Sequence, residues 1–344
     1  MTIDLRSDTI TKPTPEMLTA MCEAEVGDDV WGDDPTVKAL EAKAAEQFGV
    51  EAALFCASGT MTNQIAIRAL TQPNDQVICD QLAHIYNYEG GGIASNALLS
   101  VRLVTGERGK IAPQQVVENI NPDDIHFPVT RLVALENTVN KGGGNYYTIK
   151  EIEAIWEVCQ QHQLKLHLDG ARLFNALVET GDSPKDYGKY FDTISLCLSK
   201  GLGCPVGSVL LGTDETIKKA RRIRKVMGGG WRQAGFLAAA GIYALDHHVT
   251  RLKEDHQRAK EVGKLLQATS FIKKVFPVDT NIVVGEVVED LQIPEVVATL
   301  AAQDIKVSTF GRRYIRLVTH LHFDDEALTT LATRLKKLTL PVAS

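Results

Sequence analysis

Three groups of polar residues stand directly after short apolar runs, where their side chains could take part in chemistry. Ser58, Gly59 and Thr60 follow AALFCA, Asp169 follows LKLHL, and Lys200 follows TISLCLS. Small hydroxyl residues that open a helix can bind phosphate, because free backbone N–H groups and the positive helix end attract anions. A carboxylate keeps a heterocyclic nitrogen protonated. A lysine held out of water becomes a nucleophile.

Each group also has an ordinary structural interpretation. The S-G-T segment is typical of a turn with a helix cap, Asp169 fits a helix N-cap, and Lys200 can extend its amine from a strand end to solvent. Their combination favours one chemistry, because one parallel sheet would bring an anion cradle, an acid and a lysine to the carboxyl ends of its strands. Pyridoxal phosphate (PLP) requires all three, for its phosphate, its pyridine nitrogen and its aldehyde.

The segments around these residues alternate between strand and helix patterns. Apolar, β-branched-rich runs predict strands, and apolar residues at three- and four-residue spacing predict helices. The expected strands are residues 52–56, 76–80, 100–104, 131–137, 164–169, 193–199 and 207–212, and the helices between them include 61–70, 149–163 and 171–181. This rhythm predicts an α/β fold, in which a mainly parallel sheet carries helices on both faces.

The last third of the chain has a different pattern. A long helical stretch over residues 233–269 is followed by strands at 282–288 and 314–320 and helices at 294–303 and 324–338. This order predicts a smaller α+β domain. The chain of 344 residues is long enough for two domains. We therefore expect a large domain over 1–250, with an N-terminal arm that reaches the active site, and a small domain over 251–344.

Composition excludes several classes of protein. The net charge of -6 disfavours nucleic-acid binding, and the basic run at 218–225 fits an exposed or interface face of a helix. No run of eighteen apolar residues predicts a membrane span, and the N-terminus lacks the apolar stretch of a signal peptide. Six cysteines without a C-x-x-C pair are expected to be buried thiols. We expect a cytoplasmic protein.

Histidine pairs do not predict a metal site. His247 and His248 are adjacent on a helical pattern and point in different directions, so we expect surface positions. His320 and His322 would share one face of a strand, but no third ligand stands nearby, so structural use is expected.

Seven segments give the sequence a specific resemblance, and together they span residues 4–320. The chain resembles the L-threonine aldolases in DLRSDT, EVGDDVWGDDPTV, ASGTMTNQ, HLDGARLFNA, CLSKGLGCPVGS, MGGGWRQAG and IRLVTH. The resemblance implies the fold-type I PLP-dependent transferase fold. It also implies a homotetramer built from dimers, with active sites at the subunit interface, and a small amino-acid substrate.

For the cofactor, the resemblance implies a role at each matching position. Lys200 would form the Schiff base with PLP, Asp169 would pair with the pyridine nitrogen, and the 58–60 segment would bind the phosphate. His84 would stack on the ring. Arg232 would reach the phosphate of the neighbouring subunit.

For the substrate, the resemblance implies a carboxylate site and a base. Arg172 would contact the ring oxygen or the substrate carboxylate, and Ser7 and Arg316 would also bind that carboxylate. His84 and His126 would approach the substrate hydroxyl, and either is a candidate base because imidazole exchanges protons near neutral pH.

Two positions depart from the family pattern. Trp31 stands where tyrosine is common, and Val139 stands where histidine commonly follows E-N-T. Both leave the cofactor residues unchanged, so the departures bear on the preferred side chain and hydroxyl stereochemistry of the substrate.

The expected reaction is PLP-dependent cleavage of L-threonine or L-allo-threonine to glycine and acetaldehyde. The residues by themselves leave β-elimination, amino-acid racemisation and transamination open, because these reactions use the same lysine, acid and phosphate cradle. A non-catalytic protein with this fold is also left open. A dinucleotide enzyme would need G-x-G-x-x-G after the first strand, which CASGTM does not supply.

Overall fold

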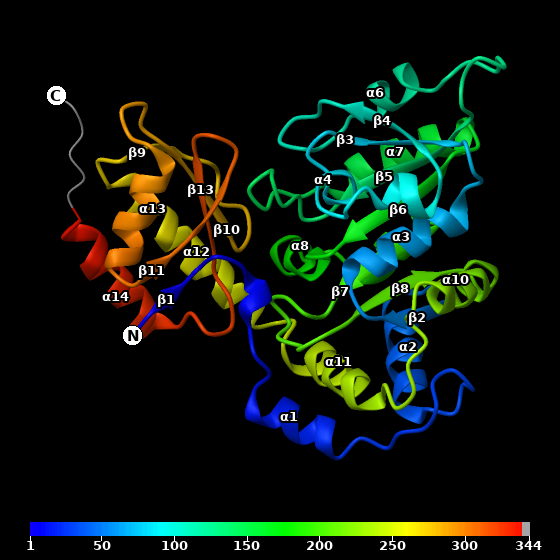
Figure 1. Cartoon of the computed structure of the whole chain (residues 1–344), viewed down its shortest axis with the longest axis horizontal. Coiled ribbons are helices and arrows are strands. Elements are labelled where there is room, and N and C mark those ends of the chain that lie inside the picture. The colour runs from blue at the N-terminus through cyan, green and yellow to red at the C-terminus, as the bar shows by residue number, and fades with distance from the viewer. Residues whose placement is uncertain (339–344) are drawn as a thin grey trace.

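A computed structural model describes residues 1–338 of the chain. Its larger half is built on a seven-stranded sheet (Figure 1). The spatial order is β2 (Ala52–Cys56), β8 (Ser208–Gly212), β7 (Thr193–Cys197), β6 (Lys165–Gly170), β5 (Thr130–Glu136), β3 (Gln76–Asp80) and β4 (Ser100–Val104). Only β8 runs antiparallel to its neighbours in this sheet. The other six strands therefore end at one common edge.

Helices cover both faces of this sheet, as its alternating side chains require. On one face, Ala53 and Phe55 pack with α2 (Pro35–Phe48), α7 (Ile149–Gln161), α8 (Leu173–Thr180) and α11 (Gly235–His247). On the other face, Leu54 and Cys56 pack with α3 (Gly59–Leu70) and α10 (Asp214–Val226). Residues one apart in a strand point to opposite faces, so a buried sheet needs apolar residues at every position.

Shorter helices connect these layers. They are η1 (Asp8–Ile10), α1 (Pro15–Cys22), α4 (His84–Asn87), α5 (Gly92–Asn96), α6 (Pro113–Glu118) and α9 (Pro184–Gly188). The mainly parallel sheet with helices on both faces is the architecture expected from the sequence.

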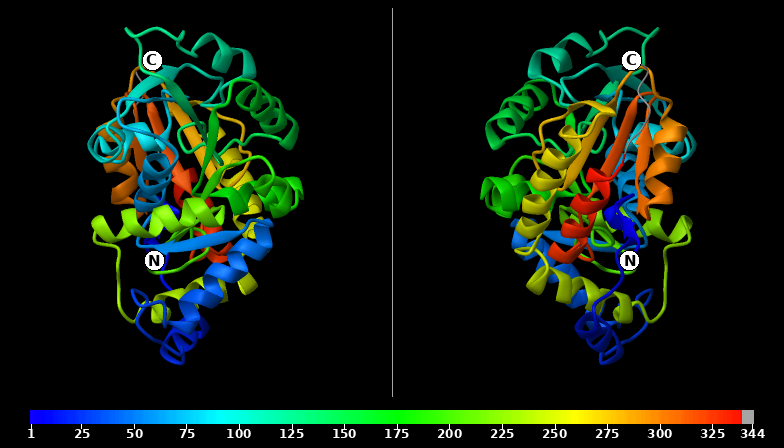
Figure 2. Two further views of the ribbon diagram at one scale, coloured as in Figure 1. Left: turned by 90° about the vertical axis from the view of Figure 1, so that its right-hand side faces the viewer. Right: turned by 90° about the vertical axis from the view of Figure 1, so that its left-hand side faces the viewer.

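The smaller half contains an antiparallel sheet of four strands. Their order is β12 (Ser308–Phe310), β13 (Tyr314–Val318), β10 (Ile282–Val287) and β9 (Ile272–Val275). It packs with α12 (Leu252–Gln267), α13 (Ile293–Ala302) and α14 (Asp325–Lys336). The views of Figure 2 show these helices on one side of the sheet.

The N-terminal segment also lies in the smaller half. β1 (Ile3–Asp4) pairs in parallel with β11 (Ile305–Lys306), and Ile3 and Leu5 are buried in the same core as Leu317. Figure 1 shows the blue chain leaving this half toward α1. The boundary between residues 250 and 251 stays a prediction, and the first residues belong with the small sheet by their packing.

Four local expectations were wrong. The helical stretch over 233–269 is two helices, α11 and α12, separated by a turn. His248 caps α11 and is buried with its Nδ1 2.7 Å from the Leu202 carbonyl oxygen, so it is not a surface residue. In the basic run, Arg224 is buried because it donates to Asp29 at 2.7 Å. Among the cysteines, Cys22 is exposed and the other five are buried thiols.

His320 and His322 have the structural use that was expected. His320 Nε2 lies 2.8 Å from the Asp4 carbonyl oxygen, and His322 Nε2 accepts from the Lys12 N–H at 2.9 Å. Both imidazoles therefore fasten the N-terminal arm to the smaller half. No helix in the described part of the chain is long and apolar enough to cross a membrane.

Candidate active site

The N-terminus of α3 begins at the common edge of the large sheet. The Ser58 hydroxyl caps this helix by accepting from the Met61 N–H at 3.2 Å. The backbone N–H groups of Gly59 and Thr60 have no partner among residues 1–338. A Cβ on Gly59 would lie 2.5 Å from the sulfur of Cys197 at the end of β7. Because Gly59 has no side chain, the start of α3, with its free N–H groups, can lie against the end of β7.

Asp169 lies at the end of β6, beside this helix. Its side chain is buried, with Oδ1 accepting from the Ala171 N–H at 3.1 Å and Oδ2 from Asn63 Nδ2 at 3.0 Å. Asn63 is on α3, so one amide ties the helix to the acid. A second tie joins Thr62 Oγ1 to Ser195 Oγ at 2.5 Å. The predicted cradle and the predicted acid therefore belong to one assembly.

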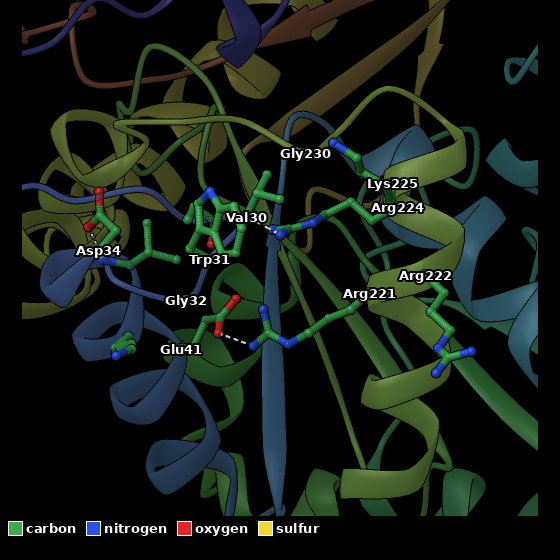
Figure 3. Close-up of a pocket in the computed structure, with 13 residues that line it drawn as sticks. Val30, Trp31, Gly32, Asp34, Glu41, Arg221, Arg222, Arg224, Lys225 and Gly230 are labelled. Carbon is green, nitrogen blue, oxygen red and sulfur yellow. Dashed lines mark hydrogen bonds and ion pairs between the residues drawn. The ribbon is translucent and has the colours of Figure 1, made fainter.

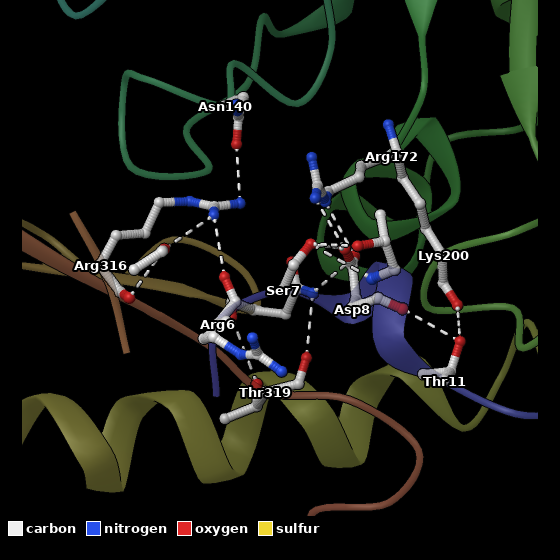
Figure 4. Close-up of polar contacts among 12 residues, drawn as sticks. Arg6, Ser7, Asp8, Thr11, Asn140, Arg172, Lys200, Arg316 and Thr319 are labelled. Atoms are coloured by element: carbon white, nitrogen blue, oxygen red, sulfur yellow. Dashed lines mark hydrogen bonds and ion pairs between the residues drawn. The ribbon is translucent and has the colours of Figure 1, made fainter. Parts of the chain in front are cut away.

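Lys200 follows β7 and lines a cavity of about 300 Å³. Its backbone carbonyl accepts from Thr11 Oγ1 at 2.9 Å, which holds the N-terminal arm next to it (Figure 4). The same cavity is lined by Ser7, His84, Arg172 and Arg316. The structure thus brings together the lysine and four of the residues expected to serve it.

Arg172 is fixed by a carboxylate from the N-terminal arm. Its Nε and Nη2 donate to Asp8 Oδ2 and Oδ1 at 2.8 and 2.7 Å, and both residues are buried (Figure 4). Burial alone would raise the pKa of Asp8, but the charge and hydrogen bonds of Arg172 hold it well below its ordinary value. Such a bidentate pair fixes the guanidinium plane. It leaves Nη1 of Arg172 without a bond to residues 1–338.

Arg316 comes to the cavity from β13 of the smaller sheet. Its Nη2 donates to Asn140 Oδ1 at 2.8 Å, and its Nη1 lies 3.3 Å from both Ser308 Oγ and the Arg6 carbonyl oxygen. Burial and the charge of Arg172 lower the pKa of Arg316 to about 10. The guanidinium therefore stays charged at neutral pH, and its fork is suited to a carboxylate.

His84 opens α4 at the end of the loop after β3. Its backbone N–H donates to Glu136 Oε2 at 2.8 Å, and its Nδ1 lies 3.0 Å from Glu89 Oε1. Burial lowers the pKa of His84, but Glu89, Asp169 and Glu136 outweigh it and leave the pKa raised. Burial and the charge of Asp169 raise the pKa of Glu136 to about 7. This part of the site therefore gathers several carboxyl groups, and that of Glu136 is shifted toward its neutral form.

The β-eliminating lyase family matches residues 4–290. The chain belongs to this family. Among its relatives, the low specificity L-threonine aldolase of Escherichia coli (strain K12) is 42% identical over 331 residues, covering 96% of this chain and 97% of the relative. A probable low-specificity L-threonine aldolase 2 of Arabidopsis thaliana is 40% identical, covering 94% and 93% of the two chains.

The fold of this lyase is shared with solved structures. The threonine aldolase of Leishmania major superimposes with a TM-score of 0.85 over 97% of this chain and 99% of that chain, at 22% identity. A putative L-allo-threonine aldolase from Listeria monocytogenes superimposes with a TM-score of 0.81 at 20% identity, over 95% of each chain. At these identities the likeness establishes the architecture.

The described residues of the lyase fit PLP. Free N–H groups and hydroxyls at the start of α3 suit a phosphate. The Asp169 carboxylate suits a protonated pyridine nitrogen, and Lys200 suits the aldehyde. The three lie at one edge of one sheet, at the ends of β2, β6 and β7.

Two predicted site residues lie elsewhere on a single chain of the lyase. His126 is on an exposed loop, with its side chain 79% accessible and its Nδ1 2.7 Å from Asp124 Oδ1. Arg232 is exposed and donates from Nη1 to Asp28 Oδ2 at 2.8 Å. The structure does not bring either residue to the cavity of the same chain. Their roles stay predictions.

The two departures from the family pattern have different surroundings in this lyase. Trp31 is 78% exposed, and Val139 is 1% exposed within the large core. The neighbours of Val139 in sequence, Asn140 and Lys141, line the cavity instead. The loop therefore presents polar groups to the cavity while the valine packs behind it.

Sequence reasoning missed four residues that organise the site. They are Asp8, Asn63, Glu89 and Asn140, which hold Arg172, Asp169, His84 and Arg316 respectively. Asp8 and Asn63 stand in segments that carry the resemblance, Asn140 follows Val139, and Glu89 lies five residues after His84. A polar residue near a functional one gives no signal of its partner. Only the fold pairs residues as distant in sequence as Asp8 and Arg172.

Proposed function

We propose that this lyase cleaves L-threonine and L-allo-threonine to glycine and acetaldehyde with PLP as cofactor. The observation that carries the proposal is the convergence of Lys200, Asp169 and the N-terminus of α3 at one sheet edge, beside a cavity with two arginines. The names of the E. coli and A. thaliana relatives support the aldol reaction and the breadth of substrate.

The proposed roles follow from the geometry. PLP, when bound, supplies an electron sink for the electrons of the Cα–Cβ bond. Ser58, Gly59 and Thr60 would bind its phosphate, Asp169 would pair with its ring nitrogen, and Lys200 would bind its aldehyde.

Groups on three segments of the chain would bind the substrate carboxylate. Arg316 offers a charged guanidinium, Ser7 a hydroxyl, and Arg172 its free Nη1. Holding the substrate at several points orients the bond that breaks, which converts binding energy into rate.

A base must take the proton of the substrate hydroxyl. His84 lines the cavity with Lys200, and its Nε2 has no partner among residues 1–338. We therefore propose that His84 is the base that accepts the hydroxyl proton. His126 is the second candidate, and it would have to reach a site from its exposed loop.

The proposal includes a homo-oligomer, a tetramer of two dimers with sites at the interface. Val30 and Trp31 project beside a cavity of about 510 Å³ that is also lined by Arg222 and Lys225 (Figure 3). The exposed apolar side chains of Val30 and Trp31 are contiguous and lie beside charged residues, an arrangement that marks interaction surfaces. Arg232 lies in the adjacent loop, where Asp29 N–H donates to its carbonyl at 2.9 Å. A second copy on this face could receive Arg232 in its phosphate site.

One assay tests the reaction. Purified protein with PLP is incubated with L-threonine, L-allo-threonine, L-serine and L-alanine, and acetaldehyde, glycine, pyruvate and D-isomers are measured. Acetaldehyde and glycine in equal amounts are expected from both threonine diastereomers. Pyruvate from serine as the main product would instead indicate β-elimination, and D-alanine would indicate racemisation. Absence of any product, with no borohydride-reducible absorption, would indicate a non-catalytic protein.

The proposal also includes a cytoplasmic location. Five buried free thiols fit a reducing compartment. Fractionation of the native cells, with the protein detected by antibody, checks the location.

A further inference from the structure

Glu89 lies behind His84, outside the set of residues that line the cavity. It is 6% exposed and follows α4, with Oε1 3.0 Å from His84 Nδ1. The same oxygen accepts from Asn63 Nδ2 at 2.8 Å, and Oε2 accepts from Gln64 Nε2 at 2.6 Å. The carboxylate of Glu89 is therefore held in place by contacts with three different side chains.

The amide of Asn63 links this carboxylate to the cofactor acid. One N–H goes to Glu89 and the other to Asp169 Oδ2 at 3.0 Å, while Oδ1 lies 3.1 Å from His167 Nε2. His167 is buried, and burial lowers its pKa to about 4, so it is neutral. Because carboxylates accept, the amino group of Asn63 faces Glu89 and Asp169, and its Oδ1 then accepts from His167 Nε2. The orientation of the Asn63 amide is therefore fixed, and its donors point at both carboxylates.

A metal ion is a poor occupant of this cluster. Ligand atoms of His84, Glu89 and Asp169 lie within 4.8 Å of one another. However, the amino group of Asn63 lies between the two carboxylates and donates to both. A cation there would face these N–H donors, whereas a protonated imidazole and amide donors satisfy the same oxygens.

We propose that Glu89 is a positioning residue, which holds the proton of His84 on Nδ1 and so presents Nε2 to the cavity as the proton acceptor. This inference rests on the proposed function, because it concerns the base of the aldol cleavage. When the Cα–Cβ bond breaks, the hydroxyl proton would pass to Nε2 of His84 and the hydroxyl oxygen would become the aldehyde oxygen. PLP, when bound, would supply the acceptor for the electron pair of the broken bond. The carboxylate of Glu89 then stabilises the imidazolium.

The groups around His84 favour this arrangement. Glu89, Asp169 and Glu136 present negative charge to the imidazole, and burial opposes them. The ring of Tyr88 lies 5.5 Å from that of His84 between centroids. The cations on the same cavity are Lys141, Arg172, Lys200 and Arg316. Only Glu89 contacts a ring nitrogen of His84 in the described part of the chain.

Glu89→Gln separates positioning from mere packing, because glutamine keeps the shape and some hydrogen bonds but removes the charge. Its amide can also donate to Nδ1, which would put the imidazole proton on Nε2 and block the acceptor. The titration of His84 is read in the protein without cofactor, from the hydrogen–deuterium exchange of the imidazole Cε1–H measured by mass spectrometry of the His84 peptide.

The expected result for Glu89→Gln is a downward shift of the His84 midpoint by about one pH unit. In the PLP-loaded enzyme, the acid limb of kcat/KM for threonine should move to lower pH by the same amount, because that limb reports the base of the free enzyme. kcat should fall at least about tenfold. Glu89→Asp keeps the charge and should restore the titration in part.

Glu179→Gln is a matched control, because Glu179 Oε2 lies 3.0 Å from His256 Nδ1 away from the cavity. It should move the titration of His256 and leave that of His84 and the pH profile unchanged. An unmoved His84 midpoint and acid limb in Glu89→Gln would overturn the inference, even if the variant were less stable. Failure of the proposed function would differ, because the unaltered protein would then lack aldol cleavage.

Discussion

At the scale of single residues, the site is assembled from charges that are buried in pairs. The contact of Asp8 with Arg172 removes two charges from water, and each is tolerable only because the other is present. Asp8→Ala should lower the free energy of unfolding by about 3–5 kcal/mol, because Arg172 is left buried without a partner. Urea denaturation monitored by circular dichroism measures this change.

Asp4→Ala provides the comparison for that variant. Asp4 pairs with Arg6, whose side chain is 51% exposed. Water screens such a pair, so its loss should change the free energy of unfolding far less than the loss of Asp8 does. Equal losses in the two variants would contradict the importance of burial.

The pair between Asp8 and Arg172 should also make stability depend on pH. The pKa of Asp8 is held well below its ordinary value in the folded protein, so the unfolded chain binds its proton first as pH falls. The stabilisation is complete above the unfolded pKa of about 4 and is lost as the pH falls below it. Urea midpoints between pH 7 and pH 3 should fall more steeply in the unaltered protein than in Asp8→Ala. Parallel curves would refute this.

Lys200 should be required for covalent attachment of the cofactor. Lys200→Ala is expected to abolish the borohydride-reducible absorption and to reduce aldol turnover to background. Among the described lysines that line the cavity, Lys200 is the one that follows β7. Lys43→Ala alters a surface lysine paired with Asp246 and should keep both properties. Full turnover in Lys200→Ala would show that Lys200 is not the residue that binds the cofactor covalently.

At the scale of elements, the contact between α3 and β7 should control cofactor affinity. Gly59→Ala places a Cβ 2.5 Å from Cys197 Sγ, so the helix start must move. A clash of this kind costs about 1–3 kcal/mol, and cofactor binding should weaken by about 10- to 100-fold. Absorbance titration of the cofactor-free protein measures the affinity.

The double variant Gly59→Ala/Cys197→Ala identifies the cause. Removing the sulfur makes room for the new methyl group, so much of the lost affinity should return. If the double variant binds no better than Gly59→Ala alone, the clash is not the reason for the loss.

At the scale of the whole molecule, mixing of two variant chains tests whether Arg232 acts in the site of a neighbouring subunit. Lys200→Ala and Arg232→Ala should each be nearly inactive alone. In a hybrid dimer, one site would receive both intact residues and the other neither, so random mixing after unfolding and refolding should restore about a quarter of the activity. No recovery in verified hybrids would mean that Arg232 does not act across subunits.

Many features of the fold were predictable from the sequence, because they depend on local pattern. The seven strands of the large sheet lie within two residues of their expected ends. Continuous apolar runs have to be buried on both faces, whatever their neighbours are. The stretch over 233–269 was predicted as one helical run but contains two helices. The contact of His248, which lies at the end of the first helix, with Leu202 joins residues that periodicity does not relate.

The candidate site shows where sequence information ends. The types and positions of Ser58, Asp169 and Lys200 predicted one cofactor, because three parallel strands must end at a common edge. Their supports, such as Asp8 for Arg172 and Glu89 for His84, were decided only by the tertiary structure. Local sequence pattern determines which residues can do chemistry. The close packing of distant segments determines which charged groups are buried together, and therefore how each side chain is oriented and protonated.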